Sequence, residues 1–261
     1  MKNFTIKQIA DELGAEAFGD LELEITGVNA PSRASINELA LAMDPSYEES
    51  LNSSDANAAI VWPGADWKKI GLMGGIIAPR SRYILSGITH LFEKKPEIVE
   101  GIHPSAIISK SVILGKNISI GAFVVIGERV KIGNNTKILS HTTISEDAII
   151  DENALIYSGV RIGARVKIGK NFICQSNTVI GVDGFSYVTP EPGAVEEAKR
   201  TGKITANSRT ERFERINSLG TIIIGENVEI GANSAIDRGT IENTIIGDGC
   251  KLDNLVHVGH N

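Results

Sequence analysis

The chain contains 261 residues and has a formal net charge of -6, a length that suffices for one large domain or two of ordinary size. Hydrophobic residues make up 42% and charged residues 22%, which argues against a disordered chain. The 27 glycines beside only 5% aromatics indicate many turns and small side chains rather than an aromatic-rich core. The mildly acidic balance argues against nucleic acid as a main partner.

Targeting and metal-binding signals are weak. The opening segment MKNFTIKQIADELGAEAFGD has no basic region, long apolar stretch or cleavage site of a signal peptide. The sequence also has no apolar run of the roughly 18 residues that a transmembrane helix needs. Cys174 and Cys250 lie far apart, which fits neither a disulfide framework nor a paired metal spacing. We expect a cytoplasmic protein with no transmembrane segment and no metal.

Residues 1–98 predict a small α/β domain. Thr5 and Gln8 form a capping box for a first helix that ends at Gly14. A second helix is expected between Pro79 and Glu93. Its apolar face is predicted to carry Tyr83, Ile84, Ile88, Leu91 and Phe92. Three segments predict strands, namely LELEITGV (21–28), AAIVW (58–62) and GGIIA (74–78).

From residue 102 onward the sequence repeats every six residues. The apolar positions are Ile102, Ile108, Leu114, Ile120, Ile126, Ile132, Ile138, Ile144, Ile150, Ile156, Ile162, Ile168, Cys174 and Ile180. Glycine often follows them and is expected to permit a tight turn. Asparagines recur at every third turn, where positive φ is tolerated, at positions 117, 135, 153 and 171. The pattern predicts three-sided coils of short strands, with apolar side chains stacked along the axis.

The repeat is interrupted once and then resumes. Residues 185–219, called the excursion below, are rich in charge and turn formers and too long for an ordinary turn of the coil. The hexads return with Ile224, Ile230 and Ile236 and, after a slip of four residues, with Ile246, Leu252 and Val258. The predicted fold is mainly β, with the coil occupying residues 99–261.

Several strings carry a family resemblance. They are LALAMDPSY (39–47), GIHPSA (101–106), GVDGFSY (181–187), IGANSAIDRG (230–239) and LDNLVHVGHN (252–261). The repeat resembles the left-handed parallel β-helix of hexapeptide acyltransferases. With these strings, the chain resembles the UDP-3-O-(3-hydroxyacyl)glucosamine N-acyltransferases of lipid A synthesis. The resemblance implies a left-handed parallel β-helix preceded by an α/β uridine-nucleotide-binding domain, assembled as a homotrimer with active sites between subunits.

The resemblance also implies a reaction. A 3-hydroxyacyl chain passes from an acyl carrier protein thioester to the 2-amine of UDP-3-O-acyl-glucosamine, with no cofactor besides that acyl donor. His260 matches the catalytic histidine of the family, and an imidazole is a suitable base near neutral pH. Asp253 matches a family aspartate, and we expect it either to orient His260 or to cap a turn.

Three residues of the N-terminal domain match the family segment that holds the uracil. Tyr47 matches the tyrosine that stacks on the base. Leu41 stands where the family usually has an aromatic residue, and Asp44 stands where it usually has asparagine. The first departure removes a ring that would stack on the base, and the second removes an amide donor, so both bear on which nucleotide binds and how tightly.

We expect several other residues to have structural roles. Cys174 occupies an axis position and is expected to act as a small hydrophobe, which favours direct attack by the amine over a thiol intermediate. The pair Asp237 and Arg238 is expected to be structural, and His257 structural or cleft-lining.

Alternatives remain open at this stage. The scaffold also suits an acetyl-CoA-dependent sugar acetyltransferase or a non-catalytic sugar-nucleotide binding or assembly protein. A metal-dependent hydratase would use His257 and His260 but has no evident third ligand. The chain stops at Asn261, within an unfinished hexad. The resemblance implies that relatives continue through further coils and helices that engage the carrier protein. Three interpretations follow: the chain is truncated, another chain covers its last coil, or the protein has lost the family activity.

Overall fold

The computed structural model describes residues 3–94, 96, 98–190, 193–204 and 212–260. The chain divides into two compact units, Met1–Pro96 and Glu97–Asn261. No helix of the described residues is long and apolar enough to cross a membrane.

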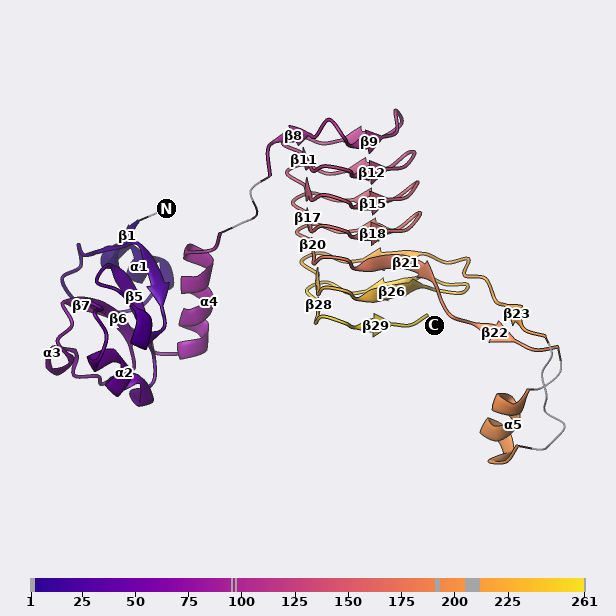
Figure 1. The fold of residues 1–261 in the computed structure, drawn as a ribbon. Helices are drawn as coiled ribbons and strands as arrows, with labels where there is room; N and C mark the ends of the chain where they lie inside the picture. The colour runs from indigo at the N-terminus through magenta and orange to yellow at the C-terminus, as the bar shows by residue number, and fades with distance from the viewer. Residues whose placement is uncertain (1–2, 95, 97, 191–192, 205–211, 261) are drawn as a thin grey trace. The chain divides into compact units, whose positions relative to one another are not determined.

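The first unit is built on a five-stranded sheet in the order β2-β7-β6-β5-β4, in which β2 alone runs antiparallel to its neighbour (Figure 1). Its strands are β2 (Ala17–Gly19), β4 (Gly27–Asn29), β5 (Glu38–Ala42), β6 (Ala58–Val61) and β7 (Gly74–Ile77), and β1 (Phe4–Thr5) pairs separately with β3 (Glu24–Ile25). Its α-helices are α1 (Ile6–Leu13), α2 (Glu48–Asn52), α3 (Trp67–Ile70) and α4 (Ser81–Leu91). Short 3-10 turns span Pro31–Arg33 and Pro45–Tyr47.

Alternation along β5 divides the apolar side chains between two cores. Leu39 packs with Ile9 of α1 and Ile84 of α4 in one cluster. Ala40 faces the other way and packs with Leu51 of α2. Such alternation follows from the two-residue period of a strand. The sequence did not predict β5 as a strand because its segment lacks β-branched residues.

The helix predictions for this unit are largely confirmed. The Thr5 N–H donates to Gln8 Oε1 at 2.9 Å, the Gln8 N–H donates to Thr5 Oγ1 at 3.2 Å, and Gly14 ends α1 with a φ of 58°. On α4, Ile84 and Ile88 are buried as predicted. Tyr83 is 68% exposed, so its place on the apolar face was wrong. It precedes Ile84 by one residue, about 100° around the helix, and falls outside the stripe.

The second unit is the predicted left-handed parallel β-helix, with three parallel sheets (Figure 1). The first sheet contains β10 (Ile113–Leu114), β13 (Lys131–Ile132), β16 (Ile149–Ile150), β19 (Lys167–Ile168), β24 (Ile222–Ile224) and β27 (Thr244–Ile246). The second contains β8 (Gly101–Ile102), β11 (Ser119–Ile120), β14 (Lys137–Ile138), β17 (Leu155–Ile156), β20 (Ile173–Cys174), β25 (Glu229–Ile230) and β28 (Lys251–Leu252). The third, called face D below, contains β9 (Ile107–Ile108), β12 (Val125–Ile126), β15 (Thr143–Ile144), β18 (Arg161–Ile162), β21 (Val179–Asp183), β26 (Ala235–Arg238) and β29 (His257–Val258).

The hexad residues form the axis core that the repeat predicts. Ile120 pairs in register with Ile138, and Ile138 with Ile156, so identical positions stack coil upon coil. These side chains are buried from Ile120 to Ile246, whereas Ile102 in the first coil is 52% exposed because no coil of the unit covers it. Axis packing between equivalent residues therefore holds the coils together.

Several glycines after the axis residues serve a different purpose from the expected one, although Gly181 does have a positive φ of 90°. Gly115 and Gly133 do not have positive φ. A β-carbon on Gly115 would lie 2.7 Å from the backbone nitrogen of Asn134, and one on Gly133 would overlap the backbone of Glu152. Glycine is needed there because successive coils approach closely, whereas the turn itself is made two residues later.

The turn positions carry an asparagine ladder. Asn117, Asn135, Asn153 and Asn171 have φ between 55° and 62°, which confirms the predicted positive φ. Each side-chain amide donates to the next asparagine: Asn135 Nδ2 to Asn153 Oδ1 at 3.1 Å, and Asn153 Nδ2 to Asn171 Oδ1 at 3.1 Å. Asn227 extends the ladder across the excursion, at 3.0 Å from Asn171. Asparagine thus tolerates the positive φ of the turn and also forms a hydrogen bond to the next coil.

The excursion leaves face D after β21 and returns before β24. Its described part contains β22 (Tyr187–Val188), α5 (Ala194–Thr201) and β23 (Glu214–Arg215), and β22 and β23 pair antiparallel. Residues 191–192 and 205–211 of the predicted excursion lie outside the described residues. The axis residues stay in register across the excursion, because Ile168 pairs with Ile224 and Ile180 with Ile236. The pairing of β21 with β26 shifts by one residue directly after Ile180.

The ladder gives a stability prediction. Replacing Asn153 by alanine should lower the free energy of unfolding of the β-helix by about 2 kcal/mol, because two ladder bonds are lost and alanine is strained at positive φ. Asn153→Gly should cost about half as much, since glycine is free of that strain. Far-UV circular dichroism in urea measures the effect.

The chain contains an internal control for this measurement. Its two tryptophans, Trp62 and Trp67, both belong to the first unit, so their fluorescence reports unfolding of that unit. This transition should not move in either variant. Equal stability of the alanine and glycine variants would contradict the role given to positive φ.

Candidate active site

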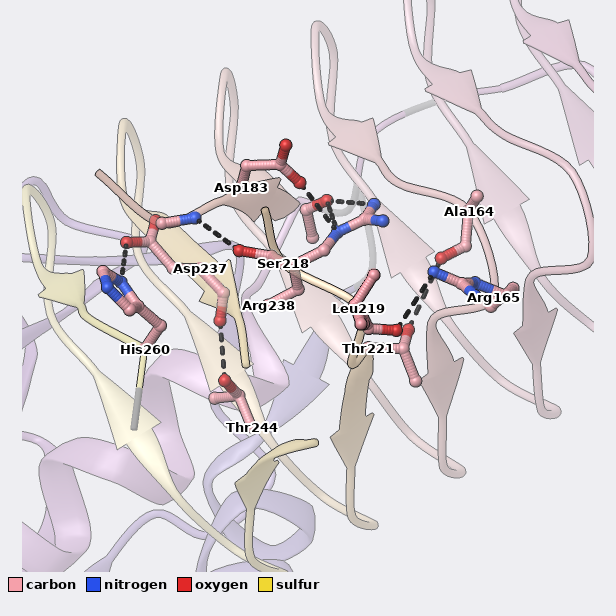
Figure 2. A network of polar contacts seen from close by, with 12 residues as sticks. Ala164, Arg165, Asp183, Ser218, Leu219, Thr221, Asp237, Arg238, Thr244 and His260 are labelled. Carbon is pink, nitrogen blue, oxygen red and sulfur yellow. Dashed lines mark hydrogen bonds and ion pairs between the residues drawn. The ribbon is translucent and has the colours of Figure 1, made fainter. Parts of the chain in front are cut away.

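His260 follows the last strand of face D and contacts a carboxylate on the preceding strand. β26 and β29 are parallel neighbours, with Ile236 opposite Val258. His260 Nδ1 lies 3.4 Å from Asp237 Oδ2 (Figure 2). The Thr244 hydroxyl donates to the backbone carbonyl of Asp237 at 2.7 Å and fixes that strand end. The β-helix therefore brings together two residues that belong to successive coils.

A second imidazole shares the same carboxylate oxygen. His257 Nε2 lies 3.1 Å from Asp237 Oδ2. The Asp237 side chain is 7% exposed, that of His260 19% and that of His257 65%. A buried carboxylate needs partners of this kind, and the two ring nitrogens supply them. His257, which was predicted to be structural or cleft-lining, therefore contacts the carboxylate of Asp237.

The arrangement suits proton transfer. When Nδ1 of His260 donates to Asp237, its Nε2 has a free lone pair and can accept a proton. A carboxylate in this position can hold that tautomer and can stabilise an imidazolium. The His260 side chain keeps some exposure to solvent, whereas the Asp237 carboxylate is almost completely shielded from it.

Arg238 has a structural role within the chain. Its Nε and Nη2 donate to the carbonyl of Gly181 at 2.9 and 2.5 Å, and its Nε lies 3.7 Å from Asp183 Oδ1. Asp237 and Arg238 were predicted as a structural pair, but only Arg238 has that role. It binds the end of β21, whereas Asp237 contacts His260.

Asp253 does not contact His260 within the chain. It lies in the turn after β28, a strand of the second sheet, whereas Asp237 and His260 belong to face D. Asp253 is exposed, and its Oδ1 accepts the backbone N–H of Asn254 at 2.7 Å. Within the chain, Asp253 makes a turn contact, and the carboxylate that contacts His260 is that of Asp237.

The sequence contained a signal for Asp237 that was not used. Asp237 directly follows the axis residue Ile236, and one coil later, after the four-residue slip, Val258 occupies the same axis position. A carboxylate one residue after the axis on face D is thus placed beside the segment that carries His260.

Cys174 is a buried axis residue, as predicted. It is fully buried in the core, and burial raises the pKa of its thiol to about 12. A thiol with this pKa forms almost no thiolate at neutral pH, so it cannot serve as a nucleophile. Among the described residues, no group of three or more His, Cys, Asp or Glu is placed to hold a metal ion.

The predicted uracil-binding residues lie at the carboxyl end of β5 in the first unit. Leu41 is half-buried and packs against the α1 and α4 side of the sheet. Asp44 begins the Pro45–Tyr47 turn and accepts hydrogen bonds from the Ser46 N–H at 2.9 Å and hydroxyl at 2.6 Å. The Ser46 hydroxyl and N–H lower the pKa of Asp44, which keeps it ionised. Tyr47 is 45% exposed and presents its ring to solvent.

Fold and site together define a hexapeptide-repeat protein of the acyltransferase class. A UDP-3-O-acylglucosamine N-acyltransferase of Ruegeria pomeroyi is 56% identical over 259 residues, which are 99% of this chain and 71% of that protein. The corresponding protein of Paracoccus denitrificans is 53% identical over 98% of this chain and 70% of its own length. The chain therefore belongs to the family of UDP-3-O-acylglucosamine N-acyltransferases, and the resemblance of its sequence strings is confirmed.

Two further similarities are more distant. The family model described as "GMPPB C-terminal domain" matches residues 100–185. The solved structure of Arabidopsis UDP-N-acetylglucosamine acyltransferase is 23% identical, covers 61% of this chain and 49% of its own, and has a TM-score of 0.48.

The burial of Cys174 gives a second prediction. In the folded chain at pH 8, a thiol reagent should modify only Cys250, which is half-buried, because Cys174 is protonated and enclosed. Both thiols should react after unfolding in guanidinium. Counting modified thiols by mass spectrometry checks this, and native reaction at Cys174 would contradict its axis position.

Proposed function

We propose that this chain transfers a 3-hydroxyacyl chain from an acyl carrier protein thioester to the 2-amine of UDP-3-O-acyl-glucosamine, with His260 as general base. The observation that carries this proposal is the contact between His260 Nδ1 and the buried carboxylate of Asp237 in a member of this family. Asp237 is the positioning residue for the imidazole. No cofactor is required besides the thioester donor.

The reaction needs one base and no enzyme nucleophile. The neutral amine attacks the thioester carbonyl, the C–N bond forms, and the C–S bond breaks as the carrier thiolate leaves. The proton lost from nitrogen passes to Nε2 of His260 and then to the leaving sulfur. The buried state of Cys174 supports this direct route over a thiol intermediate.

We place the binding site of the uridine nucleotide in the first unit. Tyr47 is exposed enough to stack on uracil, and the ionised Asp44 can accept the ring N–H but cannot donate. Leu41 offers an apolar contact in place of a second ring. As in the resemblance described above, we propose a homotrimer that receives the acyl carrier protein.

Replacing the dyad tests the chemistry. With UDP-3-O-hydroxyacyl-glucosamine and hydroxyacyl-carrier protein, His260→Ala should lower kcat by about 10²–10⁴-fold because the base is removed. Asp237→Asn should lower it by at least about tenfold, since an amide neither fixes the tautomer nor stabilises the imidazolium. Product mass measures both effects.

Asp253→Asn is the matched control for Asp237→Asn and should retain most of the activity, because Asp253 contacts a turn. A larger loss in the Asp253 variant would reverse the assignment of the two carboxylates. UDP-sugar binding by a folded parent without acyl transfer would show a binding protein. Turnover of acetyl-CoA in place of the carrier thioester would show an acetyltransferase.

The nucleotide site has its own test. Tyr47→Ala should weaken UDP-sugar binding by about 3- to 10-fold through loss of ring stacking. Isothermal titration calorimetry measures the affinity. The matched control is Tyr83→Ala, which removes another exposed tyrosine of the same unit and should leave the affinity unchanged. Equal affinity for the Tyr47 variant and the parent would remove Tyr47 from the site.

A further inference from the structure

The excursion begins and ends beside the histidine of the site. Gly184 lies directly after β21, and a β-carbon built on it would overlap three ring atoms of His260, Nδ1, Cγ and Cε1. Gly184 has no positive φ, so its backbone does not require glycine. The absence of a side chain is therefore a matter of space: the imidazole packs against the backbone at this residue.

The last residues of the excursion contact Gly184 as well. The backbone N–H of Gly184, the residue before the excursion, donates to the Ser218 hydroxyl at 3.2 Å. This bond ties the start and the end of the excursion together next to His260. The Ser218 side chain is the acceptor that holds Gly184 in position. Leu219 then donates its N–H to the Thr240 carbonyl at 2.8 Å and anchors the returning chain.

An ionic chain extends this connection in both directions. Asp183 Oδ1 lies 3.7 Å from Nε of Arg238, the residue after Asp237. Asp183 Oδ2 lies 3.2 Å from Nη2 of Arg215 on β23. Arg215 also donates to the Tyr187 hydroxyl at 3.3 Å on β22. The paired strands of the excursion are thus linked to the segment that presents the carboxylate.

We propose that Gly184 and Ser218 are positioning residues for His260, so that the excursion holds the imidazole against Asp237. Asp237 contacts the ring at Nδ1, and the Gly184 backbone packs against the ring atoms. With both in place, the ring has little freedom to turn, and Nε2 faces the substrate in one orientation. Confining a catalytic group in this way contributes to rate through geometry, without a new contact to the substrate.

This inference rests on the proposed function for its kinetic readout and has a second readout that does not. Gly184→Ala adds one methyl group where the ring lies, so kcat should fall by about 100-fold, with an unchanged KM for the UDP-sugar. Ser218→Ala should reduce kcat by about tenfold, and Ser218→Thr, which keeps the hydroxyl, should restore it. Gly247→Ala is the matched control, because a β-carbon there meets no atom within 4 Å.

The independent readout is the proton position on His260. The chain has five histidines, and nitrogen NMR of protein labelled at histidine resolves Nδ1 from Nε2, with His260→Asn identifying the signals. Gly184→Ala and Ser218→Ala should change the His260 signals, whereas Gly247→Ala and Ser218→Thr should not.

Parent-like His260 signals and parent-like kcat in both Gly184→Ala and Ser218→Ala would overturn the inference. If Gly184→Ala does not fold, as judged by circular dichroism, the two Ser218 variants decide alone. If the parent shows no acyl transfer, the proposed function fails, and the His260 signals still decide whether Gly184 and Ser218 position the ring.

Discussion

Axis stacking in the β-helix is the constraint on which the rest of the second unit depends. One apolar side chain per hexad packs on its equivalents in the coils above and below, and this fixes which neighbouring residue faces outward. The close approach of the coils then demands glycine after several axis residues, and the turn that follows demands positive φ. Asparagine tolerates this φ and donates a hydrogen bond to the asparagine of the next coil. The same stabilising contact is therefore repeated from coil to coil.

The candidate active site uses the same regularity. Because strands of one face pair in register, a carboxylate on one coil and histidines on the next are neighbours without any dedicated loop. Asp237 is buried and accepts two imidazole contacts on one oxygen, while His260 keeps partial exposure. A strand thus carries the carboxylate, which limits its movement relative to His260.

The excursion shows how a regular solenoid accommodates an insertion at its site. The coil continues in register across it, since Ile168 pairs with Ile224, so the insertion costs the axis packing little. Its two ends meet at Gly184 and Ser218, beside His260. The excursion interrupts the hexad repeat of the sequence, and in the structure its ends lie beside the imidazole of His260.

The sequence by itself determined the architecture and much of the site. The six-residue period predicted the β-helix, its axis residues and the positive φ of Asn117 and its equivalents, because each coil repeats one local pattern. The family strings pointed to His260 as the candidate base. Only the tertiary structure showed that Asp237 rather than Asp253 contacts His260, and that Gly184 packs against its ring. Both contacts join residues from different coils. The hexad register places Asp237 beside the segment that carries His260 but does not show which side chains touch. The packing of Gly184 depends on the course of the chain around the excursion, which the repeat does not describe.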